Sequence, residues 1–394
     1  MRIAHVTDSF LPRLGGIENH VDDLARHQLA NGHDVHVITA TAGVRTPEPD
    51  CGPTVHRLGS HWLGAARRAA FGAGREERLL TRGRYDMVHV HASVISPLAA
   101  AFAAAATDCG IPTAVTVHSM WPENRLLLAA TGAGLRLAQR PIAWSAVSQV
   151  VATPIRRALG GALPVAVLPN AVGTAWWQAG QPAAPPRPTR GAEVVVASVM
   201  RLAPRKRPMP LLRMMERVHD RVAGEVPLRL VIAGDGPQRT AIERHVQRRG
   251  MADWVDLPGR LSRPAIRDLL ASSSLYVAPA NLESFGIAAL EARVIGLPIV
   301  AKTRGGVGEF VRPGIEGLLA GSDREMADAI AHLAVGTTLR TRIREHNQRV
   351  LPSVDWPNAL ARTERLYARA AVLAGTRTHQ HARSLAGADS EAPA

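Results

Sequence analysis

Two glutamates, Glu283 and Glu291, flank a stretch whose residue types suit the binding of a phosphate-containing ligand. Apolar residues at helical spacing predict a helix over residues 284–295, and the first backbone N–H groups of a helix have no partner within it. Such a helix start attracts anions, and eight helical residues span about 12 Å. The two carboxylates would then hold hydroxyl groups at the two ends of a ligand with a diphosphate in its middle, such as a nucleotide sugar. The N–H groups predicted to bind the diphosphate are those of Phe285, Gly286 and Ile287. Two surface charges on an amphipathic helix would show the same spacing.

The charge of the chain also points to an anionic partner. Its 47 Lys and Arg residues outnumber 33 Asp and Glu residues, which gives a formal net charge of +14. A potential of this sign attracts phosphates, nucleic acids and lipid headgroups. Lys206 and Lys302 are the only lysines, and an Arg-rich, Lys-poor composition is equally typical of a GC-rich genome. The charge alone therefore does not select among these partners.

The composition limits the class of protein. The 394-residue chain is 46% apolar and 20% charged, so it can bury a sizeable core. Its longest uncharged apolar run, residues 95–107, is shorter than the roughly 20 residues needed to cross a bilayer, and its apolar start is too short for a secretory signal. We expect a cytoplasmic protein. Cys51 and Cys109 lie far apart without a metal-ligand spacing, so neither a disulfide framework nor a metal cofactor is expected.

The elements that must position these residues alternate between strands and helices. Such alternation predicts an α/β fold, with a parallel sheet covered on both faces. The first series has strands over 2–6, 34–38, 87–91 and 113–117, with helices over 17–31 and 98–106. The second has strands over 194–199, 228–233, 274–278 and 298–301, with helices over 210–222, 240–249 and 284–295.

A Pro-rich stretch without apolar periodicity separates the two series and predicts a linker over 176–191. We therefore expect an N-terminal domain over 1–175, a C-terminal domain over 192–355 and a disordered tail over 375–394. Ligands bind at the carboxyl ends of the strands in open α/β sheets, so two doubly wound, Rossmann-like domains would face each other across a cleft.

Several short motifs, taken together and in this order, resemble the pattern of glycosyltransferase family 4. The resemblance covers residues 1 to about 370. It implies a GT-B fold, retention of the anomeric configuration, and a last helix near 356–373 that returns to the first domain. Besides the Glu283–Glu291 stretch, the motifs are Gly15-Gly16-Ile17-Glu18, Gly32-His33, Pro169-Asn170, Arg201 with Lys206, Gly234-Asp235-Gly236-Pro237, Gly305-Gly306 and Gly317-Leu318-Leu319.

The resemblance implies a role for each charged residue of the C-terminal half. Glu291 would bind the ribose hydroxyls and Glu283 those of the transferred sugar, while Arg201 and Lys206 would neutralise the diphosphate. Fixed cations would also stabilise charge that builds on a departing diphosphate. For Arg201, an ordinary surface arginine is the alternative. The sequence contains no Asp-x-Asp motif for a divalent metal, in agreement with metal-independent transfer.

Two residues of the N-terminal half belong to the same prediction. Gly16 follows the first strand, where the absence of a side chain would let the backbone approach the phosphate or the acceptor; a turn glycine is the alternative. His118 ends the strand over 113–117, and the resemblance implies a histidine there that hydrogen-bonds the donor sugar. A satisfied core histidine is the alternative.

The sequence departs from the family pattern at two positions that the pattern gives to glycine. These are occupied by Met200 and Arg207, and a side chain at Met200 is expected to crowd the backbone near the phosphates.

We therefore expect a retaining glycosyltransferase that moves a hexose from a UDP- or GDP-sugar to the hydroxyl group of a lipid, glycan or small molecule. A nucleotide-sugar epimerase or a phosphorylase on the same fold is one alternative. An Arg-rich protein that binds nucleic acid or anionic lipid is another, but no nucleic-acid recognition motif is evident. Residues 62–84 mix arginines with apolar residues, which suits peripheral contact with the inner face of a membrane. Three glycines in that segment favour a solvated face instead.

Overall fold

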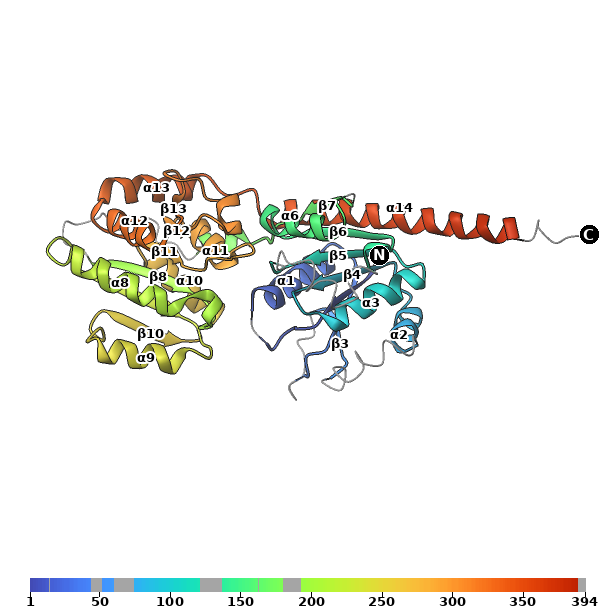
Figure 1. The fold of residues 1–394 in the computed structure, drawn as a ribbon, viewed down its shortest axis with the longest axis horizontal. Helices are drawn as coiled ribbons and strands as arrows, with labels where there is room; N and C mark the ends of the chain where they lie inside the picture. The colour runs from blue at the N-terminus through green and yellow to red at the C-terminus, as the bar shows by residue number, and fades with distance from the viewer. Residues whose placement is uncertain are drawn as a thin grey trace, which may run out of the picture. The chain divides into compact units, whose positions relative to one another are not determined.

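The computed structural model describes residues 1–13, 15–43, 52–59, 74–120, 137–161, 163–179 and 193–388 (Figure 1). The chain divides into two compact units. Unit 1 consists of Met1–Asn170 together with Trp356–Ala394, and unit 2 is Ala171–Asp355. Each unit has a parallel sheet of its own, so the α/β fold class is confirmed.

Unit 1 is built on a seven-stranded sheet in the order β3-β2-β1-β4-β5-β6-β7, in which neighbouring strands are parallel. Parallel strands are covered on both faces and are therefore nearly continuous runs of buried residues, as in β5, where all five residues are buried. The strands are β1 (Arg2–Thr7), β2 (Asp34–Thr39), β3 (Thr54–Arg57), β4 (Met87–Ala92), β5 (Thr113–Val117), β6 (Ile142–Ala146) and β7 (Val165–Val167).

The helices of unit 1 include one from the far end of the sequence. Trp356, the first residue of that helix, stacks on His20 and His27 of α1, with ring centroids 5.5 and 4.5 Å apart. Further along, Leu366, Tyr367 and Ala370 join a buried cluster with residues of four strands of this sheet. The helices are α1 (Gly16–Ala30), α2 (Arg75–Gly83), α3 (Pro97–Asp108), α6 (Gln149–Ala158) and α14 (Trp356–Ala388).

Unit 2 has a six-stranded parallel sheet in the order β10-β9-β8-β11-β12-β13. Its strands are β8 (Val194–Val199), β9 (Leu228–Ala233), β10 (Val255–Gly259), β11 (Leu275–Ala278), β12 (Ile299–Lys302) and β13 (Gly317–Ala320). Its helices are α7 (Thr174–Gln178), α8 (Pro208–Val222), α9 (Arg239–Arg248), α10 (Arg263–Ser272), α11 (Ile287–Ile295), α12 (Asp323–Val335) and α13 (Thr337–Arg349), with short 3₁₀ turns η2 (Pro204–Lys206) and η3 (Gly306–Glu309).

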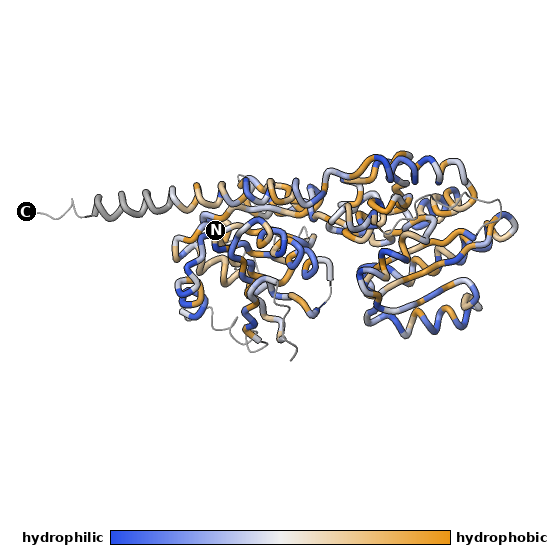
Figure 2. The backbone as a smooth tube through the Cα atoms, turned by 180° about the vertical axis from the view of Figure 1, so that it is seen from behind, coloured by the Kyte–Doolittle hydropathy of each residue, from blue (hydrophilic) through white to orange (hydrophobic). Residues whose placement is uncertain are grey.

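Hydrophobic burial holds each unit together. The core of unit 2 joins residues of β8, β9 and β11 to the inner faces of α8 and α12. Figure 2 shows the same principle along α14, where apolar and polar residues alternate as in a helix with one buried face. Among the described residues, no helix combines the length and apolar character that a membrane span requires.

Several element boundaries differ from the sequence-based expectation. The first unit ends at Asn170 rather than at 175, and α7 occupies residues 174–178, at the start of the expected linker; residues 180–191 of that linker lie outside the described residues. The last helix continues to Ala388, beyond 373 and into the segment expected to be disordered; residues 389–394 lie outside the described part.

The segment expected at a membrane surface is only partly described, because residues 60–73 lie outside the described part. The remainder forms α2. Its Leu80 is fully buried, whereas Arg75, Arg78 and Arg82 are exposed. Leu80 therefore packs inside unit 1, Leu79 is half-buried, and the three arginines lie on the exposed side of the helix.

Candidate active site

Charged side chains gather at the carboxyl ends of three neighbouring strands of unit 2. β11 lies between β8 and β12. Lys206 follows β8, Glu283 follows β11, and Lys302 is the last residue of β12. Since all the strands are parallel, the loops that carry these residues leave the same edge of the sheet. Open α/β sheets bind their ligands at this edge.

Lys206 and Glu283 form an ion pair, with 2.5 Å between Lys206 Nζ and Glu283 Oε2. The side chains are 27% and 18% exposed, so the pair is partly shielded and still reachable from solvent. The two residues are 77 positions apart in the sequence. The structure thus brings together a cation and an acid that the sequence placed in one site.

Three glycines let the backbone pack closely around Glu283. The N–H of Gly306 donates to the carbonyl of Glu283 at 2.8 Å, and a Cβ on Gly306 would lie 2.4 Å from the carbonyl oxygen of Ser284. A Cβ on Gly305 would lie 3.2 Å from Glu283 Cβ. Gly286 has a φ of +94°, in the left-handed region that favours glycine. The Gly305-Gly306 motif therefore has a packing role beside the acid.

Helix α11 begins at Ile287, and not at residue 284 as expected. Gly286 is its N-cap residue, and the first backbone bond within the helix runs from Leu290 N–H to the Gly286 carbonyl. Ile287 is therefore the only one of the three predicted anion donors inside the first turn. Gly286 precedes the helix, and Phe285 is 2% exposed and contacts Phe310, with ring centroids 5.4 Å apart. The turn's own N–H groups are those of Ile287, Ala288 and Ala289.

The late start of α11 also changes the position of Glu291. It lies about one turn from the start of the helix instead of two, and it is half-buried. Both glutamates act on the same neighbour, Tyr276. Burial raises the pKa of the Tyr276 hydroxyl, and the charges of Glu283 and Glu291 raise it further. The two carboxylates therefore both lie near the hydroxyl of Tyr276.

Arg201 follows β8 directly and is exposed, and its side chain has no hydrogen-bond or ion-pair partner among the described residues. Its backbone is held by close packing: Cβ atoms on Gly234 and Gly236 would lie 1.8 Å from the carbonyl oxygen of Met200 and 2.6 Å from that of Leu202. The side chain of Met200 packs against the core of unit 2. Its crowding of the backbone near the phosphates stays a prediction.

Arg207 belongs to a network that sequence reasoning missed. Its guanidinium donates to both carboxylate oxygens of Asp323, at 2.8 and 2.6 Å, and to Asn281 Oδ1 at 2.6 Å. Lys302 binds the same Asp323 at 2.7 Å. Hydrogen bonds from Arg207 and Lys302 lower the pKa of Asp323 to about 2. These contacts tie the loop after β8 to β12 and the start of α12, behind Lys206.

Gly16, a predicted site residue that lies in unit 1, is the first residue of α1 and is exposed. Its neighbour Gly15 lies against the side chain of Glu18, which is 8% exposed. Gly16 thus lies after β1, as predicted, and begins the first helix one residue before the expected start. Its contact with a ligand stays a prediction.

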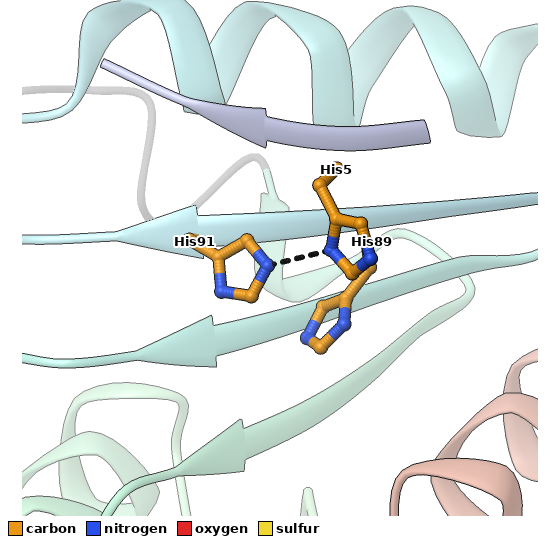
Figure 3. A group of neighbouring side chains, drawn as sticks. All are labelled: His5, His89 and His91. Atoms are coloured by element: carbon orange, nitrogen blue, oxygen red, sulfur yellow. Dashed lines mark hydrogen bonds between the residues drawn. The ribbon is translucent and has the colours of Figure 1, made fainter. Parts of the chain in front are cut away.

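His118 follows β5 and is 6% exposed, and its Nε2 lies 3.0 Å from Nδ1 of His91. Burial lowers the pKa of His118 well below the usual value for histidine. It belongs to a buried group with His5, His89 and His91, which Figure 3 shows without His118. One ring nitrogen of each of those three lies within 4.8 Å of the others, a spacing that a shared metal ion would also require.

A signal for this group exists in the sequence. His89 and His91 are two residues apart in β4 and therefore lie on one face of the sheet. Finding His5 beside them also requires the pairing of β1 with β4, where His5 is the register partner of His89. Strand order cannot be read from the local pattern.

Two parallel α/β units and a last helix that returns to the first unit are the architecture of the GT-B fold. Residues 14–176 match the family described as Glycosyltransferase Family 4, and residues 184–350 match the family described as Glycosyl transferases group 1. The chain belongs to glycosyltransferase family 4 and is an enzyme of the glycosyltransferase class.

Three known proteins illustrate the similarity. The phosphatidylinositol N-acetylglucosaminyltransferase gpi3 subunit of Schizosaccharomyces pombe is 25% identical over 381 residues, which cover 92% of this chain and 79% of the relative. A phosphatidylinositol N-acetylglucosaminyltransferase chain of Homo sapiens is 26% identical over 388 residues, which cover 94% of this chain and 76% of the relative. The crystal structure of Anabaena HepE in complex with UDP and glucose shares the fold, with a TM-score of 0.66, 20% identity, and coverage of 98% of this chain and 100% of that chain.

Proposed function

We propose that this enzyme transfers a hexose from a UDP- or GDP-sugar to a hydroxyl group of its acceptor and retains the anomeric configuration. The observation that carries the proposal is the ion pair of Lys206 with Glu283 next to Gly286, the N-cap residue of α11. The exposed Arg201 follows β8, the strand whose loop also carries Lys206. Cationic side chains bind the phosphate oxygens of a diphosphate. Carboxylates accept hydrogen bonds from the hydroxyl groups of the ribose and the sugar on its two sides.

The ion pair suggests how the donor enters the site. When a diphosphate arrives, Lys206 exchanges its carboxylate partner for phosphate oxygens, and Glu283 becomes available to the hydroxyl groups of the sugar. Arg201 joins Lys206 on the diphosphate, and Glu291 accepts from the ribose hydroxyls. As the glycosidic bond to the diphosphate breaks, these fixed cations stabilise the negative charge on the leaving oxygen.

In this proposal the acceptor hydroxyl attacks from the face that the diphosphate leaves, and the departing diphosphate takes its proton. No protein nucleophile is required. Determination of the anomeric configuration of the product by NMR tests this step, and an inverted product would eliminate it.

A pyridoxal-phosphate phosphorylase is disfavoured by the lysines. Such an enzyme needs a lysine free to form a Schiff base. The two lysines of the chain are ion-paired, Lys206 with Glu283 and Lys302 with Asp323.

The proposed acceptor is a lipid, a glycan or a small molecule. The two sequence relatives named above act on phosphatidylinositol according to their names, which supports including this lipid beside glycans and free inositol among the acceptors tried. A lipid acceptor would bring the enzyme to the inner membrane face. Transfer to glycans or inositol alone would contradict that location.

Thermal unfolding with nucleoside diphosphates and their sugars tests the donor site. A ligand that binds only the folded protein, at 100 times its Kd, stabilises it by about 2.7 kcal/mol. We expect one nucleoside diphosphate to raise the melting temperature by several degrees, and Glu291→Ala to lose most of that rise. Glu243→Ala on α9, which removes a partly exposed partner of Arg239, is the matched control and should keep the full rise. An unchanged rise in Glu291→Ala would remove Glu291 from the ribose site.

A further inference from the structure

A continuous set of hydrogen bonds crosses the interior of unit 1 and ends at His118. We call it the relay. Its members come from α1, α14 and four neighbouring strands, and none is more than 6% exposed. They are His118, His91, His5, Gln28, Tyr367, His89, Thr116 and Ser145.

The histidines of the relay are neutral near pH 7. Burial lowers the pKa of His5 to about 4 and places the pKa values of His89, His91 and His118 well below the usual value. A neutral imidazole carries one N–H donor and one acceptor nitrogen. Each histidine therefore has to donate on one side and accept on the other.

The direction of donation is set at one end of the relay by a backbone carbonyl. Ser145 donates its hydroxyl to the carbonyl of Val115 at 3.2 Å. Its oxygen must then accept from the hydroxyl of Thr116, at 2.7 Å. Because the only hydroxyl proton of Thr116 is used in this way, Nε2 of His89, at 2.7 Å, has to be the donor to Thr116.

Tyr367 of α14 and Gln28 of α1 continue the relay from His89 to His5, and their donors and acceptors are fixed in the same way. His89 Nδ1 has to accept, so the Tyr367 hydroxyl donates to it at 3.0 Å. Tyr367 then accepts from the side-chain amide N–H of Gln28, at 3.0 Å. This orients the Gln28 amide so that its oxygen lies 2.6 Å from Nε2 of His5, which must carry the proton.

The last two steps lead to His118. His5 Nδ1 accepts from Nε2 of His91, at 2.9 Å, the contact drawn as a dashed line in Figure 3. His91 Nδ1 accepts from Nε2 of His118, at 3.0 Å. His118 is thus protonated on Nε2, and its Nδ1 keeps a lone pair that has no partner among the described residues.

We propose that the relay holds His118 in the Nε2–H tautomer and so makes its Nδ1 a hydrogen-bond acceptor for a substrate hydroxyl. His91, Gln28 and Ser145 are positioning residues that act through His118. The contact with a substrate hydroxyl rests on the proposed function, whereas the tautomer does not.

A metal ion at His5, His89 and His91 would be incompatible with the relay. A metal needs a lone pair on each ligand nitrogen, but the His5–His91 contact has a proton between its two nitrogens. Its 2.9 Å is also shorter than the roughly 3.3 Å that separates two nitrogens on one tetrahedral zinc ion. A stoichiometric metal ion in the purified protein would overturn the proposal.

Histidine-selective ¹⁵N labelling with long-range ¹H–¹⁵N correlation reads the tautomers directly. Single histidine replacements assign the signals. We expect His5, His89, His91 and His118 all to carry the proton on Nε2. A proton on Nδ1 of His118 would show that the relay runs in the opposite direction and would overturn the proposal.

Ser145→Ala removes the hydroxyl group that sets the direction of hydrogen-bond donation along the relay. The chain offers a matched control for this change. Ser198 is equally buried and also donates to the carbonyl of a neighbouring parallel strand, that of Val277, at 2.7 Å, but it lies in unit 2 outside the relay. We expect Ser145→Ala to give a mixture of His118 tautomers and Ser198→Ala to leave them unchanged. Gln28→Met interrupts the relay at a second point and should also give a mixture. A single unchanged His118 tautomer in both relay variants would overturn the proposal.

Kinetics separate this proposal from the proposed function. Loss of one oriented hydrogen bond lowers a rate about five- to tenfold. We expect this loss in kcat for Ser145→Ala, with no change in the Kd of the free nucleoside diphosphate, whose predicted contacts lie mostly in unit 2. If the wild-type protein bound no nucleoside diphosphate, the proposed function would fail while the tautomer measurement would still stand. Equal kcat values for Ser145→Ala and Ser198→Ala would remove the positioning role.

Discussion

Arg207 has a backbone conformation that disfavours its own residue type. Its φ is +60°, and an L-residue with a Cβ pays about 1–2 kcal/mol there. The family pattern has glycine at this position, which would adopt the conformation without strain. The bidentate contact with Asp323, supported by Asn281, offsets the cost and explains how an arginine is tolerated.

Two substitutions at Arg207 separate strain from pairing. Arg207→Ala keeps the strain and loses the ion pair, so we expect a loss of about 2 kcal/mol in the free energy of unfolding. Arg207→Gly loses the pair but also the strain, so its loss should be smaller by about 1 kcal/mol. Urea unfolding measures both. Arg221→Ala, which breaks the exposed pair with Asp328, should change the free energy by less than about 0.5 kcal/mol, and equal losses in the two Arg207 variants would contradict the strain argument.

At the scale of elements, the alternation of strands and helices was predictable because buried parallel strands are apolar along their whole length. The residue at which α11 begins was not predictable in this way. Apolar spacing fits a helix from residue 284, but Gly286 takes a left-handed conformation and Phe285 turns into the core beside Phe310. A Cβ at Gly286 would collide with Val307, which lies 21 positions later in the sequence, so no local pattern contains this constraint.

The site was predictable to a similar extent. Lys206 and Glu283 could be assigned from their motifs, and the structure brings them together. The Arg207–Asp323–Lys302 network and the relay were not predicted from the sequence, because both depend on strand order and on side chains far apart in the sequence.

Gly286→Ala tests whether this glycine sets the start of α11. A Cβ there would lie 2.6 Å from Val307 Cγ2 and would also be strained by the φ of +94°. Gly314→Ala is the matched control, because its φ is +78° but nothing lies within 4 Å of the added Cβ. We expect Gly286→Ala to lose about 1–3 kcal/mol more unfolding free energy than the control, and to bind nucleoside diphosphate more weakly. Equal losses in urea unfolding would show that Val307 can move aside.

At the scale of the whole molecule, the buried histidines are expected to make unit 1 less stable than unit 2 at acidic pH. Every histidine that is buried among the described residues belongs to unit 1. Burial lowers the pKa of His5 and His20 to about 4, from 6.5, and holds those of His89, His91 and His118 well below the usual value. Below about pH 6.5 the unfolded chain binds protons that the folded unit does not, so stability falls as the pH falls toward 4.

Each such histidine contributes a slope of about 1.4 kcal/mol per pH unit, so five contribute up to about 7 kcal/mol per unit below pH 6. We expect unit 1 to unfold between about pH 6 and 4.5 while unit 2 remains folded. Hydrogen exchange of peptides from β1, β4 and β5 against those from β8 and β9 measures this. His20→Phe removes one titrating group and should reduce the slope of unfolding free energy against pH by one proton. Simultaneous loss of protection in both units would contradict this origin.

Unit 1 is also discontinuous along the chain, and this has a consequence for synthesis. Residues 171–355 leave the ribosome before Tyr367 does, so the contiguous second unit can fold while the first still lacks its last helix. Until that helix arrives, Gln28 and His89 have no phenol to connect them. A nascent chain that stalls before residue 356 would therefore expose the apolar surface of β1, β4, β5 and β6 that α14 covers, and would be a substrate for chaperones.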